Sequence, residues 1–144
     1  HFGMKMHIGV DETFGLIHSV ATTPANVSDI AVADQLLHGN EKIVWGDAGY
    51  TGIEKREEHQ GRSDDWEVTM RTGRRAQLPE NSLLHKVERM KASIRAKVEH
   101  LFLTIKRTFG YSKVRYRGLH KNQDRLIVLA AFTNLLRARP YLAT

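Results

Sequence analysis

The sequence contains no cysteine, only three prolines and no long apolar run. Without cysteine the chain cannot form disulfides, thiolate zinc sites or cysteine nucleophiles, which suits a reducing compartment. The longest apolar stretch, residues 126–132, is far shorter than the roughly 20 residues of a membrane-spanning helix. The N-terminus also lacks the layout of a signal peptide. We therefore expect a soluble, cytoplasmic protein without a membrane partner.

The length and composition predict one globular domain over residues 1–144. A chain of 144 residues buries enough surface for a core without disulfides. Its apolar content of 41% and charged content of 26% are typical of folded proteins and exclude a wholly disordered chain.

The net charge of +6 is unevenly distributed along the chain. Residues 1–60 hold four basic and nine acidic residues, whereas residues 61–144 hold eighteen basic and seven acidic ones. A strongly basic half favours a polyanionic partner, most often nucleic acid. A solvated basic face with no partner is the alternative.

Hydrophobic periodicity predicts a mixed α/β fold. Five alternating apolar residues, Phe2, Met4, Met6, Ile8 and Val10, indicate a half-buried first strand. The remaining strands are expected at 16–22, 42–45 and 66–71, with a hairpin at 11–15 and a basic loop at 72–75. Helices are expected at about 26–37, 53–59, 80–109 and 123–137, the last one ending before Pro140.

Asp47 is the first candidate for a catalytic residue. It directly follows the strand at 42–45 and lies within the glycine-rich run GDAGYTG of residues 46–52. Open α/β sheets place active-site groups at the carboxyl ends of their strands. A turn residue that bonds its own backbone is the alternative. A phosphate-binding loop is a weak interpretation, because no Gly-Lys-Ser/Thr follows the glycines.

Glu99 is the second candidate. On the helix predicted at 80–109, Arg95, Glu99 and Lys106 share a stripe at the edge of the buried face. An ordinary pair between Arg95 and Glu99, spaced i and i+4, is the alternative. The apolar stripe beside them consists of Leu84, Val87, Ile94, Val98, Leu101, Phe102, Ile105 and Phe109.

Carboxylates from a strand end and a neighbouring helix, with basic residues beside them, suit phosphoryl transfer on nucleic acid. Two Mg²⁺ ions about 4 Å apart need several hard oxygen ligands and can hold the attacking and leaving oxygens. Histidine-based sites are less well supported, because the eight histidines show neither H-x3-H nor H-E-x-x-H spacing. Two basic segments are the best candidates for contacts with the DNA backbone: Arg71, Arg74 and Arg75, and the connector residues Lys113, Arg115, Tyr116 and Arg117.

Three motifs together resemble bacterial insertion-sequence DDE transposases. They are VWGDAGYTG at 44–52, the R-x3-E-x6-K pattern from Arg95 through Glu99 to Lys106, and FGYSKVRYRGLHKN at 109–122. Glu99 follows Asp47 by 52 residues, the distance expected in that family. The opening GMKMHIGVD, the segment PANVSD at 24–29 and the C-terminal helix resemble the same family, so the likeness covers nearly the whole chain.

The resemblance implies an RNase H-like mixed sheet flanked by helices. In this family an Asp-Asp-Glu triad binds two Mg²⁺ (or Mn²⁺) ions for the DNA strand cleavage and strand transfer of transposition. Asp47 matches the second Asp and Glu99 matches the Glu. Arg95 and Lys106 match the signature basic residues, whereas Ala92 stands where a tyrosine is often found. The implied partners are transposon ends, target DNA and further copies of the chain in a homo-oligomer, with nucleoid association when bound to DNA.

The sequence departs from the family pattern at its start. The family's first Asp lies on a strand before the GMKMHIGVD strand, on which this sequence begins. We therefore expect a single, N-terminally truncated catalytic domain that lacks its first, central strand and carries two of the three carboxylates. Asp11 is expected to be a turn residue of the hairpin. The isolated chain should be marginally stable, rearranged or paired with another chain, because two inner strand edges lose their partners.

Two alternatives remain open at this point. One is a non-catalytic, metal-free DNA-binding remnant of a transposase. The other is an unrelated metal-dependent nuclease on the same fold, for which Asp11 would be the least unsuitable third acidic ligand.

Overall fold

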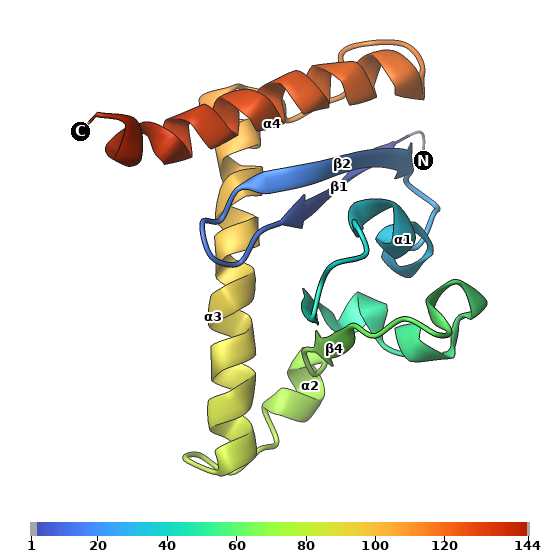
Figure 1. The fold of residues 1–144 in the computed structure, drawn as a ribbon, viewed down its shortest axis with the longest axis vertical. Coiled ribbons are helices and arrows are strands. Elements are labelled where there is room, and N and C mark those ends of the chain that lie inside the picture. Colours follow the sequence, from blue (N-terminus) through green and yellow to red (C-terminus); the bar gives the residue numbers. More distant parts are fainter. Residues whose placement is uncertain (1–2, 144) are drawn as a thin grey trace.

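The computed structural model describes residues 3–143 and shows a mixed α/β fold, as the periodicity predicts (Figure 1). His1 and Phe2, at the start of the expected first strand, lie outside the described residues. Strands β1 (Met4–Val10) and β2 (Ile17–Pro24) form an antiparallel hairpin with an irregularity at Gly9 and Val10. In its loop the Asp11 carboxylate accepts a hydrogen bond from the Phe14 amide at 2.6 Å, which confirms the expected turn role of Asp11.

A second, smaller sheet pairs β3 (Ile43–Gly46) with β4 (Asp65–Val68) in parallel. The elements around it are short: η1 (Asp29–Val32), α1 (Ala33–Leu36), η2 (Ala48–Tyr50), η3 (Ile53–Lys55) and η4 (Glu57–His59). Two expectations are therefore wrong in detail. The helix expected at 53–59 is a pair of 3₁₀ turns, and the strand expected at 66–71 ends at Val68, where its pairing with β3 stops.

The segment expected as a basic loop at 72–75 is instead the single helical turn α2 (Thr72–Arg75). The amides of Arg74 and Arg75 both donate to the Arg71 carbonyl at 3.0 Å, so local backbone bonding closes the turn. The long helix α3 (Leu83–Leu103) starts where the Ser82 hydroxyl accepts from the His85 amide. It continues as a π-helical turn, η5 (Thr104–Thr108), and ends at Gly110, whose φ of 65° favours glycine.

The last helix, α4 (Leu119–Leu142), is longer than the 123–137 that the sequence predicts. It continues through Pro140, because a proline removes a single amide donor, and the Ala143 amide still bonds the Arg139 carbonyl at 3.1 Å. Among residues 3–143, no helix combines the length and the apolar character needed to cross a membrane.

The main core joins the hairpin to the two long helices. Helix α4 lies across the end of α3 and over β2 (Figure 1), and the Asn134 side chain bonds both the amide and the carbonyl of Ile17 at 2.8 Å. By contrast, the N-terminal part of α3 projects away from this core, so Leu84 of the predicted apolar stripe is 45% exposed. The buried core residues are Ile17, Leu101, Ile105, Tyr111, Leu126, Leu129 and Ala130.

The two sheets do not join into one. Within residues 3–143, β1 pairs only with β2 and β3 only with β4. A cleft of about 1070 Å³ is lined by β1, by β3 and by the middle of α3. The candidate catalytic residues Asp47 and Glu99 lie along this cleft.

Candidate active site

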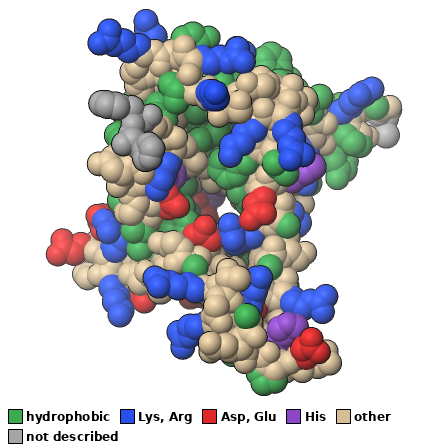
Figure 2. Space-filling model, turned by 180° about the vertical axis from the view of Figure 1, so that it is seen from behind, with side chains coloured by type: hydrophobic (Ala, Val, Ile, Leu, Met, Phe, Trp, Pro, Cys, Tyr) green, Lys and Arg blue, Asp and Glu red, His purple; other side chains and the backbone are tan. Residues whose placement is uncertain are grey.

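The cleft gathers acidic and basic side chains from separate parts of the chain. Figure 2 shows acidic and basic side chains bordering a hollow on the face opposite to that of Figure 1. The charged residues that line the cleft include Asp29 and Asp47 from the first half of the chain and Arg95, Glu99 and Lys106 from the second. Groups from the acidic and the basic halves therefore meet in one place.

Asp47 uses its two carboxylate oxygens differently. It follows β3 with an extended backbone and caps η2, where Oδ1 accepts a hydrogen bond from the Gly49 amide at 2.8 Å. The other oxygen, Oδ2, lies 3.5 Å from Nη2 of Arg95. Asp47 is therefore a turn residue, as one interpretation held, and it also presents an oxygen to the cleft.

Arg95 brings the two predicted carboxylates together. Its Nη2 atom lies 3.5 Å from Oδ2 of Asp47 and 3.5 Å from Oε1 of Glu99. The i, i+4 pair within α3 is thus present, and it is only one side of a three-residue contact. Exposed ion pairs contribute little stability, and Glu99 is 64% exposed, so its contact with Arg95 adds little to the folding energy.

Asp29 and Tyr50 belong to the same site, although sequence reasoning did not select them. Asp29 lies on η1, where Nζ of Lys5 approaches its Oδ1 at 3.2 Å. Burial and the negative charges of Asp29 and Asp47 raise the pKa of Tyr50 to about 12, while Arg95 opposes this shift. The Tyr50 hydroxyl therefore stays protonated near neutral pH. The position of Asp29 at the end of the PANVSD segment was the signal that could have identified it.

Gly49 keeps space between two carboxylates. A Cβ atom at this position would lie 2.8 Å from Oδ1 of Asp47 and 3.8 Å from Oδ2 of Asp29. Any side chain would push Asp47 away from its amide contact. The glycine in GDAGY is thus explained by the close approach of acidic groups to the backbone.

The hairpin loop is tied across one end of the cleft. The indole nitrogen of Trp45 on β3 donates to Oε2 of Glu12 at 2.8 Å, and Nζ of Lys97 on α3 donates to the Glu12 carbonyl at 3.3 Å. Glu12 therefore links the hairpin to both other walls of the cleft. Nothing in the sequence pattern indicated this role, because the contacts join segments 33 and 85 residues apart.

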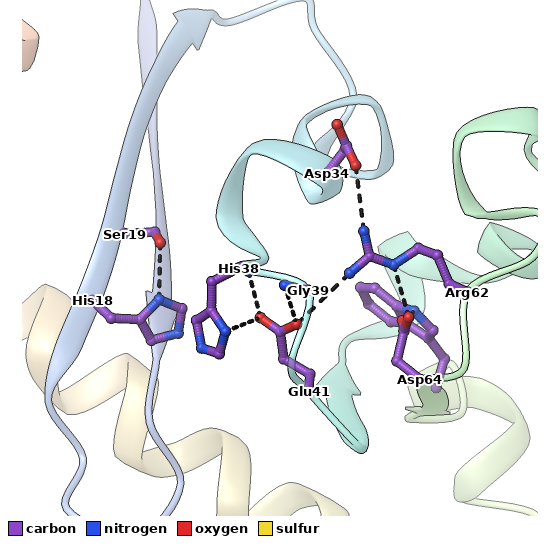
Figure 3. A network of polar contacts seen from close by, with 9 residues as sticks. His18, Ser19, Asp34, His38, Gly39, Glu41, Arg62 and Asp64 are labelled. Atoms are coloured by element: carbon purple, nitrogen blue, oxygen red, sulfur yellow. Dashed lines mark hydrogen bonds and ion pairs between the residues drawn. The ribbon is translucent and has the colours of Figure 1, made fainter.

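A polar network beside the cleft holds the segments that lead into β3 and β4 (Figure 3). Its centre is the guanidinium of Arg62, which lies 2.7 Å from Asp64, 3.6 Å from Asp34 and 3.7 Å from Glu41. Partial burial alone would raise the pKa of Glu41, but backbone hydrogen bonds, including those from His38 and Gly39, lower it. Because Glu41 lies two residues before β3 and Asp64 directly before β4, the network helps to fix where the two parallel strands begin.

The predicted DNA-binding residues fall into two groups. Lys113 of the connector (residues 111–118) lines the cleft together with Lys106, whereas Arg71, Arg74 and Arg75 lie on and before α2, outside the cleft lining. Arg115 donates to the Gly110 carbonyl at 3.1 Å, and Arg117 is exposed. The aromatic ring in the connector, Tyr116, is 44% exposed and therefore available for stacking.

Asn122, fully buried at the start of α4, holds the connector in shape. Its Oδ1 accepts from the Tyr111 hydroxyl at 2.6 Å and from the Tyr116 amide at 3.3 Å. Its Nδ2 donates to the carbonyls of Tyr116 and Gly118, both at 2.6 Å. One buried side chain thus orders the loop that presents the basic residues.

The carboxylates present make only part of a metal site. Asp47 and Glu99 offer the hard oxygen donors that Mg²⁺ and Mn²⁺ prefer. Among residues 3–143, however, no three His, Asp, Glu or Cys side chains are grouped so that they could hold a metal ion. The donor set that the sequence motifs imply is therefore incomplete in these residues.

The sequence matches the family described as "Transposase DDE domain" over residues 1–135. This match covers nearly the whole chain, and the chain belongs to that family. Its family thus points to DNA transposition, to DNA as the partner and to divalent metal ions as the cofactors that the family generally uses. No solved structure matches the chain.

Proposed function

We propose that the cleft is the catalytic centre of an insertion-sequence transposase that cleaves and transfers DNA strands. The observation that carries this proposal is the contact of Arg95 with both Asp47 and Glu99, at 3.5 Å each, in a cleft bordered by Lys106 and Lys113. A cation between two carboxylates offsets their repulsion and keeps both facing one space.

In this proposal Asp47 and Glu99 are two of the carboxylate ligands of Mg²⁺ or Mn²⁺, and a third carboxylate completes the site. We propose that the fold is RNase H-like and that the third carboxylate lies on a strand seated in the cleft. Two features support this. The β1 and β3 edges line the same cleft, and neither has a further strand partner within residues 3–143. Unpaired strand edges readily accept another strand.

The DNA would follow the basic connector into the cleft. Arg95 and Lys106 are proposed to contact phosphates near the acidic residues, with Lys113, Arg115 and Arg117 along the approach and Tyr116 stacking on a base. The segment Arg71, Arg74 and Arg75 would hold a more distant part of the duplex. The proposed setting is the bacterial cytoplasm, with nucleoid association when DNA is bound.

A plasmid-nicking assay tests the proposal. Supercoiled DNA is incubated with the chain, and with the same chain extended upstream of His1, in the presence of Mg²⁺ or Mn²⁺. Nicking that is lost in D47N and E99Q and kept in E80Q, a matched change of an exposed glutamate, supports the catalytic role. Nicking by D47N and E99Q at the unchanged rate contradicts it.

A second candidate function is DNA binding without cleavage. The observation that favours it is the lack of a three-ligand metal group among residues 3–143. Salt-sensitive DNA binding without nicking by either polypeptide, at any concentration of Mg²⁺ or Mn²⁺, would establish this function and exclude the catalytic one.

A further inference from the structure

Helix α4 has a second apolar face, most of which stays exposed within residues 3–143, although the Phe132 ring there lies beside the ring of Phe109, with centroids 6.2 Å apart. Its inner face packs on β2 through Leu126, Leu129 and Ala130. Yet Phe132 is 50% exposed and Leu135 is 57% exposed, and both lie on the outer side. A helix with apolar residues on opposite faces is normally buried on both of them.

The outer residues form a regular seam. A spacing of seven residues relates Val128, Leu135 and Leu142. The same spacing relates Asp124 to Ala131 and Phe132 to Arg139. At about 100° per residue these positions lie within a band of roughly 100°, on the side of the helix opposite to the core-facing residues. Heptad spacing of this kind is the pattern by which one helix packs along another. We refer to residues 124, 128, 131, 132, 135, 139 and 142 as the α4 seam.

A shallow groove lies beside this seam. Its volume is about 410 Å³, and it is lined by Phe109, Phe132, Leu135, Leu136, Arg139, Leu142 and Ala143. Figure 1 shows that the C-terminal end of α4 extends past α3, so the groove lies at the periphery of the molecule. It can receive a side chain from another helix without displacing any part of the core.

We propose that the α4 seam pairs antiparallel with the α4 seam of a second copy of this chain. One register places Asp124 opposite Arg139 of the second copy and Val128 opposite its Leu135, where the groove lies. The same register sets Ala131 against Phe132, a small residue against a large one, twice in the symmetric dimer. Asp124 of each copy then pairs with Arg139 of the other, so an ion pair lies at each end of the apolar centre.

The charges disfavour the in-register parallel arrangement. In a parallel pair, Asp124 would face Asp124 and Arg139 would face Arg139, and like charges at matching positions are destabilising. Because the seam lies opposite the core-facing side of α4, two copies joined in this way keep their cores on opposite sides of the helix pair. The clefts of both copies remain open, so this interface is independent of the proposed catalytic function.

The oligomeric state tests the proposal. Sedimentation equilibrium of the full chain should show a dimer, and L135E should weaken it by about tenfold or more, because the glutamate would be buried in an apolar groove. M90E is the matched control: Met90 on α3 is similarly exposed, at 53%, and M90E should leave the dimer intact. A monomer at all concentrations, or a dimer that L135E does not weaken, would overturn the proposal.

Charge reversal and cross-linking test the register. D124R and R139D should each weaken the dimer, and the D124R/R139D double variant should restore it. Because the chain has no cysteine, V128C and L135C chains can be mixed and oxidised without background thiols. A V128C–L135C disulfide between chains is expected. Cross-linking of V128C to itself, or no rescue by the double variant, would overturn the antiparallel register.

Discussion

Arg95 contacts two carboxylates through a single nitrogen atom, and it thereby brings together acidic side chains from two different elements. Asp47 comes from the end of a strand, Glu99 from the same helix as Arg95, and Oδ1 of Asp47 is already engaged by Gly49. The sequence predicted that Arg95, Glu99 and Lys106 would share one edge of the helix. It could not predict that Asp29 and Tyr50 would join them, because that depends on how the chain crosses the cleft.

The two roles of Asp47 can be separated by substitution. In D47N the amide oxygen can still accept from Gly49, so the cap is kept while the charge is lost. In D47A both are lost, and the variant should be less stable than D47N by about 1 kcal/mol, the usual worth of a capping side chain. Urea unfolding measures the difference. Equal stability of the two variants would show that the contact at 2.8 Å is not a stabilising cap.

His7 should make stability depend on pH. Burial lowers the pKa of His7, the charge of Asp29 opposes this, and Lys5 adds to the lowering. Since the unfolded chain binds the proton more readily, stability is complete above a pH of about 6.5 and is lost as the pH falls toward the folded-state pKa. H7Q should flatten the profile of unfolding free energy between pH 7 and pH 5. An unchanged profile would mean that other groups cause the loss.

At the scale of elements, local signals located most helices and strands but not their ends or their pairing. Alternation predicted β1, and periodicity predicted α3, because these patterns lie within one segment. The parallel pairing of β3 with β4 depends on residues more than 20 positions apart, and α2 forms through bonds to Arg71 that no propensity indicated. Pro140 misled the prediction of where α4 ends, since a single lost amide is tolerated in a last turn.

The connector and the start of α4 form one unit through Asn122. N122A should cost roughly 2 to 4 kcal/mol, because it removes several hydrogen bonds and leaves buried polar groups unpaired. Y111F removes only the hydroxyl bond of 2.6 Å and should cost about 1 kcal/mol. Thermal unfolding of both variants checks these values, and hydrogen exchange of residues 111–118 should rise only in N122A. A loss in N122A no larger than in Y111F would show that the backbone holds the connector without this side chain.

At the scale of the whole molecule, the uneven charge of the chain becomes a spatial arrangement. The acidic first half supplies Asp29 and Asp47 to the cleft, and the basic second half supplies Arg95, Lys106 and Lys113. The two sheets stay separate within residues 3–143, and that a central strand is missing between them stays a prediction. The sequence alone could not show the cleft, because its walls come from β1, β3 and α3.

DNA binding by the connector should make the affinity for DNA depend on salt concentration through Arg115 and Arg117. The magnitude of the slope of log affinity against log salt concentration should decrease by about 1 in R115A and by about 1 in R117A, each compared with the unsubstituted chain. Each arginine releases counterions from the phosphates that it neutralises. K55A, an exposed lysine of the acidic half, is the control and should not change the slope. Fluorescence anisotropy with a short duplex measures these slopes. Equal slopes in all four proteins would exclude the connector from the DNA contact.

The main core has a consequence for synthesis on the ribosome. The hairpin of β1 and β2 is made first, but its apolar face is buried by Leu101 and Ile105 of the α3–η5 region and by Leu126 and Leu129 of α4. Roughly 120 residues separate the end of β2 from the end of α4, which at 5–20 residues per second is about 6 to 24 s of translation. During that interval the apolar face of the nascent β1–β2 hairpin stays exposed to solvent and to other chains. Synonymous codons that slow elongation before α4 should therefore lower the yield of folded protein.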